Sequence, residues 1–168
     1  LMAVSMTIMR VHEQDKGVSL KSTAKYVAGH SLGEYSALAA AGALSLTDTA
    51  RLLKIRGQSM QAAVPVGEGA MAALLGLDLP DAQKLAEAAA QGDVCEAAND
   101  NAPGQVVLSG AKAAIERAVE MASEFGARRA VLLPVSAPFH CALMKPAADA
   151  MQDALAALDI KAPAVTMV

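Results

Sequence analysis

The segment "YVAGHSLGEYSALAAAGAL", Tyr26 to Leu44, constrains the fold more than any other part of the chain. A short apolar run ends in Gly-His-Ser-Leu-Gly and continues into an Ala-rich sequence with helical character. The pattern predicts a short buried strand over 24–29, a sharp turn at Ser31 and a helix over 32–42. Strand, tight turn and helix are the context that a nucleophile elbow requires.

The rest of the chain alternates predicted helices and strands. An amphipathic helix opens it, with Met2, Met6 and Met9 on a face expected to be buried, and residues 13–23 follow as a polar loop. Ser45 and Asp48 have capping-box spacing ahead of a further helix. From 68 to 135 the predicted order is β-α-β-β-α-β, with a turn-rich segment over 99–104 and a helix that ends at Gly126. A helix-rich segment over 143–158 and a C-terminal strand complete the pattern.

The order from 68 to 135 is the split arrangement of ferredoxin-like units. We therefore expect an α/β fold in which a small ferredoxin-like domain, residues 66–135, is inserted into a larger α/β domain formed by residues 1–65 and 136–168. The chain begins inside a predicted helix and ends in a predicted strand, so we expect a fragment of a longer protein.

Composition narrows the classes of function. Apolar residues make up 54% of the chain, which excludes a disordered tail. The net charge of −3 gives no general reason to bind nucleic acid or an anionic membrane, and no apolar run reaches membrane-spanning length. Cys95 and Cys141 fit no metal-binding or redox spacing, so we expect both to pack as small apolar groups in the reducing cytoplasm, with no metal or cofactor.

Ser31 is the first candidate for chemistry. A serine hydroxyl is a poor nucleophile until a base takes its proton and a fixed geometry exposes it. In a G-x-S-x-G turn, Gly29 and Gly33 permit tight backbone packing, and the N–H of Leu32 at the start of the helix points at a developing oxyanion. The alternative is a serine that caps an ordinary helix.

His140 is the candidate base. It lies in "PVSAPFHCALM", after a predicted strand, in a loop stiffened by Pro134 and Pro138. Loops at strand ends often carry catalytic groups in α/β proteins. The alternative is a partly buried structural histidine. His12 is expected in solvent, and His30 adjoins Ser31 too closely to be aimed at it.

Arg56 is the third candidate. Its helix is apolar on the face of Leu52, Leu53 and Ile55, and an arginine beside Gly57 suits a pocket where its guanidinium binds a carboxylate in bidentate fashion. The alternative is a solvated helix residue. Met60, one turn on, shares the face of Arg56.

No acidic residue completes a triad. Glu34 is expected to support the dipole of the helix that begins after Ser31. A Ser–His dyad, with a backbone carbonyl orienting the imidazole, remains open.

Four segments together resemble the malonyl-CoA:acyl carrier protein transacylase family over the whole chain. "GHSLGEYSALAAAGALSL" is similar to its nucleophile segment, "RGQSM" to its carboxylate-binding helix, "NDNAPGQVVLSG" to its small-domain turn and "VSAPFHCALM" to its histidine loop. The resemblance implies an acyltransferase that moves malonyl groups from coenzyme A to the phosphopantetheine thiol of acyl carrier protein in fatty acid synthesis.

The resemblance also implies residue roles. Ser31 would carry the malonyl ester, His140 would act as base and then acid, and Leu32 would give an oxyanion N–H. Arg56 would bind the malonyl carboxylate with Met60 nearby, and an acetyl group would leave the guanidinium unpaired. Phe139 before the histidine would crowd a 2-methyl branch, which favours malonyl over methylmalonyl.

The chain departs from the family pattern at both ends. The first strand, the Gly-Gln-Gly loop with a second oxyanion donor, and a Gln that orients the histidine have no counterpart here. We expect weak activity or none from these residues alone, because one lost oxyanion donor typically costs about 10²–10³ in turnover.

Two other functions stay open: a serine esterase or thioesterase on the same elbow, and a non-catalytic module that binds the carrier. An acidic carrier would need a basic rim, for which the candidates are Lys54, Lys112, Arg117, Arg128, Arg129 and Lys145.

Overall fold

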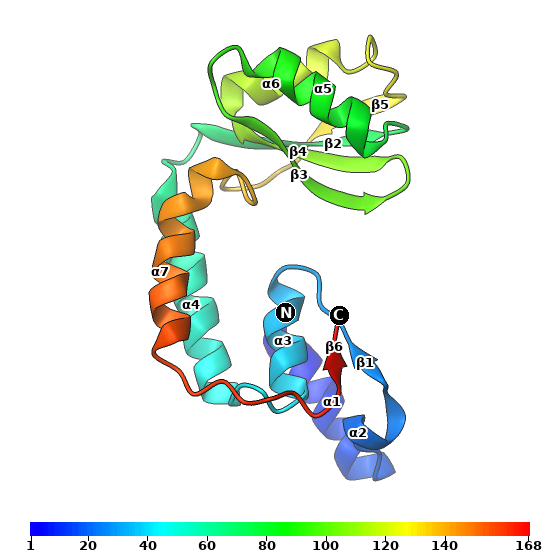
Figure 1. The fold of residues 1–168 in the computed structure, drawn as a ribbon, viewed down its shortest axis with the longest axis vertical. Helices are drawn as coiled ribbons and strands as arrows, with labels where there is room; N and C mark the ends of the chain where they lie inside the picture. The colour runs from blue at the N-terminus through cyan, green and yellow to red at the C-terminus, as the bar shows by residue number, and fades with distance from the viewer. The chain divides into compact units, whose positions relative to one another are not determined.

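The computed structural model describes residues 1–168, which form two compact units (Figure 1). Unit 1 comprises Leu1–Arg56 and Met151–Val168, and unit 2 comprises Gly57–Ala150. A parallel sheet in unit 1 and an antiparallel sheet in unit 2 confirm the mixed α/β class. The domain boundaries at 65/66 and 135/136 stay a prediction.

Unit 1 is built from helices around a small parallel sheet. Strand β1 (Tyr26–Val27) pairs with β6 (Thr166–Met167) in parallel, so the segment just before Ser31 lies beside the C-terminal end of the chain (Figure 1). The helices of this unit are α1 (Met2–Lys16), α2 (Leu20–Thr23), α3 (Leu32–Ala40), the first part of α4 (Leu46–Ala63) and the last part of α7 (Lys145–Ala156).

The start of the chain differs from the prediction in three ways. Helix α1 packs against α3, yet it contains no buried residue, and Met2, Met6 and Met9 are only half-buried. The loop expected over 13–23 is largely helical, because α1 continues to Lys16 and Ser19 caps α2 by accepting a hydrogen bond from the Ser22 N–H. The strand before Ser31 is short, and it is not buried, since Tyr26 is 63% exposed.

Helix α4 begins as predicted. Ser45 Oγ accepts from the Asp48 N–H at 3.0 Å and donates to the Asp48 carboxylate at 2.6 Å, which satisfies an N–H that the helix leaves without a partner. Its expected apolar face is only partly buried: Leu52 is buried, whereas Ile55 is 37% exposed. Leu52 packs with Leu44 and Met151 in the core of unit 1.

Unit 2 carries the element order that the sequence predicts. Strands β2 (Gly69–Leu75), β3 (Cys95–Ala102), β4 (Gln105–Ala111) and β5 (Arg129–Leu132) form an antiparallel sheet in the order β3-β4-β2-β5. Helix α5 (Leu79–Ala90) lies between β2 and β3 in sequence, and α6 (Lys112–Met121) lies between β4 and β5. Both helices cover one face of the sheet (Figure 1).

Most of the protein's core lies between that sheet face and the two helices. Leu74, Leu85, Val106, Leu108 and Ile115 are fully buried there, and the remaining volume is filled largely by alanine. Alanines of α5 and α6 let the helices approach the sheet closely, which suits a chain with only 2% aromatic residues.

Two boundaries in unit 2 differ from the sequence expectation. The turn expected over 99–104 is shorter, because β3 extends through Ala102 by two register shifts against β4. Helix α6 ends at Met121 rather than near Gly126, and turns connect it to β5. After β5, a loop over 133–141 leads to a short 3₁₀ helix, η1 (Ala142–Met144), and then to α7.

Candidate active site

Ser31 lies at the sharp turn between β1 and α3. Its backbone has φ 53° and ψ −106°, outside the regions that L-residues favour, at a typical cost of about 1–3 kcal/mol. The N–H groups of Gly33 and Glu34 bond to the carbonyl oxygens of His30 and Ser31. Neither of these two bonds uses the N–H of Leu32, the first residue of the helix.

The two glycines of the G-x-S-x-G turn serve different purposes. A Cβ added to Gly29 would lie 2.0 Å from the carbonyl carbon of Gly33, so the backbone before Ser31 touches the first turn of α3. A Cβ added to Gly33 would meet no heavy atom within 4 Å. Gly29 is therefore required for the turn itself, whereas Gly33 leaves open space beside it.

The structure brings Arg56 to Ser31 within unit 1. The Nη2 of half-buried Arg56 donates a hydrogen bond to Ser31 Oγ at 2.8 Å. The guanidinium carbon also lies 5.9 Å from the centre of the Tyr35 ring, within the range of a cation–π contact. Burial raises the pKa of Tyr35, and the positive charge of Arg56 partly opposes that rise.

His140 lies in unit 2, in the loop after β5, and its side chain is exposed. Its φ of 60° is left-handed, like that of Ser31. Pro138 before it is fully buried, and a Cβ added to Gly69 would lie 2.3 Å from Pro138 Cγ. The loop therefore packs against the start of β2 through Pro138.

Two further hydrogen bonds hold the backbone on either side of His140. The thiol of Cys141 donates to the carbonyl oxygen of Pro138 at 3.2 Å, and the N–H of Ala142 donates to Glu96 Oε2 at 3.0 Å. Ala142 begins a helix, so a carboxylate at this position is electrostatically favourable. Burial raises the pKa of the Cys141 thiol.

Met60 and Phe139 share one apolar cluster in unit 2. Both are half-buried, and both pack against a core of Val64, Ala137 and Met144. The residue one turn after Arg56 in α4 therefore belongs to the same cluster as the residue before His140.

Sequence reasoning missed Tyr35 and Glu96. Tyr35 lies in the first half of α3, four residues after Ser31, and this short separation was a usable signal. Glu96 reaches Ala142 across 46 residues, so nothing in the local sequence pointed to it. His12 is exposed, as expected, and Glu34 lies in the first turn of α3, as support of the helix dipole requires; His30 is also exposed.

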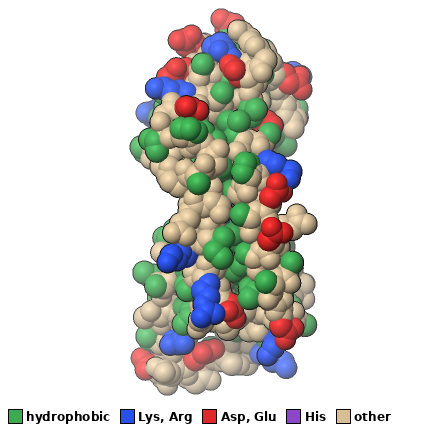
Figure 2. All heavy atoms as spheres, turned by 90° about the vertical axis from the view of Figure 1, so that its left-hand side faces the viewer, with side chains coloured by type: hydrophobic (Ala, Val, Ile, Leu, Met, Phe, Trp, Pro, Cys, Tyr) green, Lys and Arg blue, Asp and Glu red, His purple; other side chains and the backbone are tan.

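The structure removes one candidate, Arg117, from the proposed basic rim. Arg117 donates hydrogen bonds to the carbonyl oxygens of Ala89 and Ala90 at 2.8 Å each and pairs with Asp93 at 2.9 Å. It is therefore a helix-capping residue at the end of α5 rather than a cation available to a partner. On the face drawn in Figure 2, lysine and arginine side chains are interspersed with acidic ones.

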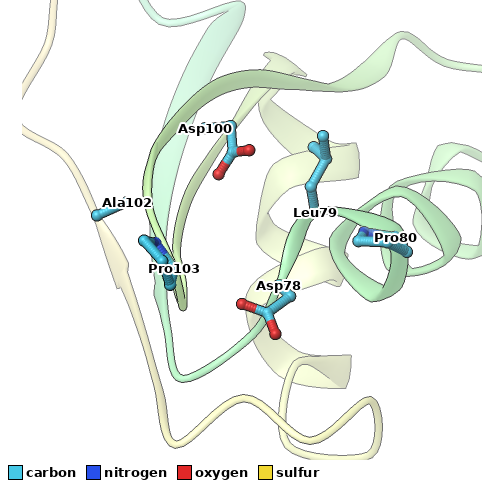
Figure 3. Close-up of a pocket in the computed structure, with 6 residues that line it drawn as sticks. All are labelled: Asp78, Leu79, Pro80, Asp100, Ala102 and Pro103. Atoms are coloured by element: carbon cyan, nitrogen blue, oxygen red, sulfur yellow. The ribbon is translucent and has the colours of Figure 1, made fainter.

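A separate cavity of about 310 Å³ lies at the start of α5, beside the β3–β4 turn (Figure 3). Asp78 and Asp100 contribute carboxylates to it, and Asp78 Oδ1 accepts a hydrogen bond from the Gly104 N–H. None of the predicted site residues lines this cavity. No group of three or more His, Cys, Asp and Glu side chains is arranged to hold a metal ion, and no helix has both the length and the apolar character to cross a membrane.

Comparison with known proteins identifies the class. The family described as "Acyl transferase domain" matches residues 2–168, and the chain belongs to this family.

Within it, the chain is similar to proteins with one named activity. It is 50% identical over 168 residues to the malonyl CoA-acyl carrier protein transacylase of Escherichia coli K12, covering 100% of this chain and 53% of the relative. The crystal structure of the acyl-carrier-protein-S-malonyltransferase of Bartonella henselae is 61% identical, with a TM-score of 0.93 over 99% of this chain and 52% of that protein.

A further solved structure contains a carrier. It is a malonyl-transacylase in complex with a type II polyketide synthase acyl-carrier protein, 44% identical, with a TM-score of 0.93 over 99% of this chain and 52% of that one. The chain spans about half the length of the curated relatives that it matches.

Proposed function

We propose that this chain carries the nucleophile, the base and the acyl-carboxylate ligand of a malonyl-CoA:acyl carrier protein transacylase. The observation that carries the proposal is the 2.8 Å hydrogen bond from Arg56 to the hydroxyl of a serine on a strained turn. A guanidinium at that distance lies where it can meet the acyl group that Ser31 accepts, and a fixed cation there is useful when the acyl group bears a carboxylate.

The reaction has two balanced steps. Ser31 Oγ attacks the thioester carbonyl of malonyl-CoA, His140 takes the hydroxyl proton, and the C–S bond breaks to release coenzyme A, whose thiolate receives that proton. The phosphopantetheine thiol of the carrier then gives its proton to His140 and attacks the malonyl ester. Ser31 leaves as its alkoxide and regains a proton from His140. The Leu32 N–H stabilises the oxyanion in both steps.

Selectivity in this proposal comes from Arg56, Met60 and Phe139. The guanidinium binds the malonyl carboxylate in bidentate fashion, so an acetyl group leaves a half-buried charge without that partner. Met60 and Phe139, which pack in one cluster, limit the space beside the acyl group and disfavour a 2-methyl branch.

The finer architecture belongs to the same proposal. The strand order β3-β4-β2-β5 with its two helices supports a ferredoxin-like small domain over 66–135. Residues 1–65 and 136–168 then form part of a hydrolase-like, parallel-sheet acyltransferase core. We place the protein in the cytoplasm, in fatty acid biosynthesis, with malonyl-CoA and acyl carrier protein as substrates and no metal or cofactor.

Incubation with labelled malonyl-CoA, followed by carrier protein or by buffer alone, tests the function. We expect slow formation of a labelled protein that is stable in buffer and that transfers its label to the carrier thiol. A serine esterase would lose the label to water at the same rate with or without carrier. A non-catalytic carrier-binding module would bind carrier equally well with Ser31→Ala and would never become labelled.

Arg56→Ala tests the source of selectivity. We expect malonyl labelling to fall by about 10²-fold, because a charge-assisted bidentate contact is lost, while acetyl labelling persists. Arg51→Ala is the control, since Arg51 lies on the same helix with a side chain that is 74% exposed. An unchanged preference for malonyl over acetyl in Arg56→Ala contradicts the assigned role.

A further inference from the structure

Tyr35 connects the core of unit 1 to Arg56. It lies on α3, four residues after Ser31, and Arg56 contacts the side chains of both residues. The half-buried ring packs against the cluster of Leu44, Leu52 and Met151. On its other side, the ring faces the guanidinium of Arg56 at 5.9 Å.

Arg56 needs such a support in order to select between acyl groups. An arginine side chain has several rotatable bonds, and its loss of rotamer freedom costs up to about 2 kcal/mol. The hydrogen bond to Ser31 Oγ weakens on acylation, because the hydroxyl oxygen becomes an ester oxygen, which is a poorer acceptor. A second contact that does not involve Oγ orients the guanidinium before the malonyl carboxylate binds and persists after acylation.

The Tyr35 ring provides such a contact. Its position is fixed by apolar packing that does not involve Ser31 Oγ, and its π-face attracts a cation. The influence of the Arg56 charge on the pKa of Tyr35 reflects the same proximity.

We propose that Tyr35 is a positioning residue for Arg56: its ring holds the guanidinium beside Ser31 through the acyl-enzyme stage and thereby sets the preference for acyl groups that bear a carboxylate. This inference rests on the proposed function of Ser31 and Arg56. The competing role for Tyr35 is that of a core residue whose ring merely fills space between α3 and α4.

The two roles predict different effects on selectivity. Tyr35→Leu keeps an apolar side chain against the cluster but removes the π-face, and Tyr35→Phe keeps the ring. We expect Tyr35→Leu to lower the ratio of malonyl to acetyl labelling of Ser31 by about 3- to 10-fold, the size of a partly desolvated cation–π contact. Tyr35→Phe should stay within about twofold of the wild type.

A double-mutant cycle shows whether Tyr35 acts through Arg56. We expect Tyr35→Leu to leave the malonyl-to-acetyl ratio unchanged when it is added to Arg56→Ala. A fall of the same size in that background, or an equal loss of malonyl and acetyl labelling in Tyr35→Leu alone, overturns the proposal in favour of a space-filling role.

A second measurement does not depend on acyl transfer. Phenylglyoxal modifies arginine side chains, and peptide mapping gives the rate at Arg56 relative to that at exposed Arg51 in the same protein molecules. We expect Tyr35→Leu to accelerate modification of Arg56 by about 3-fold or more, and Tyr35→Phe to leave it unchanged. Equal rates in all three proteins overturn the positioning role, whether or not Ser31 becomes acylated. Absence of a Ser31 acyl-enzyme in the wild type counts against the proposed function only.

Discussion

The Ser31 turn and the His140 loop both depend on a non-glycine residue with a positive φ, 53° and 60° respectively. The Ser31 turn is held from within, because Gly29 contacts the backbone of Gly33 and two backbone hydrogen bonds close the turn. The His140 loop is held from outside, by Gly69 of β2 beneath Pro138 and by Glu96 of β3 at Ala142.

The two residues therefore acquire their backbone geometry in different ways. The nucleophile turn is a local property of six consecutive residues, 29–34. The histidine loop depends on the antiparallel sheet of unit 2, so changes far away in sequence should displace it. Substitutions at the supporting positions test that contrast.

The largest effect is expected at Gly29. Its Cβ would overlap the carbonyl carbon of Gly33, so Gly29→Ala must open the turn, and a displacement of about 1 Å at a nucleophile costs on the order of 10² in rate. We expect malonyl labelling of Ser31 to fall by at least about 100-fold. Gly33→Ala is the matched control, with open space around the new methyl group and an unchanged or slightly higher Tm. Gly29→Ala should also lower the Tm. If Gly33→Ala lowers the Tm by the same amount, the contact between Gly29 and Gly33 is not what makes the turn sensitive.

The next effect is expected at Gly69. A methyl group there overlaps the ring of Pro138, which cannot rotate away, so Gly69→Ala should displace the His140 loop. Overpacking of this kind costs about 1–3 kcal/mol, which urea unfolding measures, and we expect acyl transfer to fall by about 10-fold. Adding Pro138→Ala removes the two closest overlaps, those with Cγ and Cδ, and should restore part of both losses. A double variant no better than Gly69→Ala argues against support of the loop by β2.

A smaller effect is expected at Glu96. Glu96→Ala removes the acceptor for the Ala142 N–H, a contact worth about 1 kcal/mol, and should slow acyl transfer by a few-fold. Glu96→Gln keeps a side-chain oxygen at this position and should retain most of the wild-type rate. The comparison uses single-turnover labelling, and identical rates in Glu96→Ala and the wild type remove Glu96 from the support of the loop.

The smallest effect is a dependence of stability on pH that originates in unit 2, which holds both cysteines. Burial raises the pKa of the Cys95 thiol from 9.0 to about 11. The folded protein therefore keeps this proton after the unfolded chain has lost it, so stability falls as the pH rises from about 9 to about 11. We expect a loss of about 1 kcal/mol at pH 10.

Urea unfolding at pH 8 and pH 10 measures this loss, and Cys95→Ala should reduce it. If the stability of Cys95→Ala falls by the same amount between pH 8 and pH 10, groups other than Cys95 cause the pH dependence.

The same contrast explains how far the sequence predicts the structure. The G-x-S-x-G turn, the Ser45–Asp48 capping box and the order of elements in unit 2 follow from local spacing, and the structure has all three. The Met face of α1 and the strand before Ser31 were expected to be buried and are not, because periodicity shows which residues share a face but not what covers it.

For the candidate site, too, local sequence selects the residues but not the contacts between distant parts of the chain. Ser31, Arg56 and His140 could be selected from residue type and context. The contact between Arg56 and Ser31 joins residues 25 positions apart, and the contact between Glu96 and Ala142 joins residues 46 apart. Such contacts depend on how helices and strands pack, which single-residue patterns do not encode.

The most direct test of the central claim is peptide mapping after a single turnover with labelled malonyl-CoA. We expect the label to reside on Ser31, to be absent from Ser31→Ala and to pass to the carrier thiol on addition of carrier protein. A label on any other residue, or equal labelling of Ser31→Ala, contradicts the assignment of Ser31 as the acyl-carrying nucleophile.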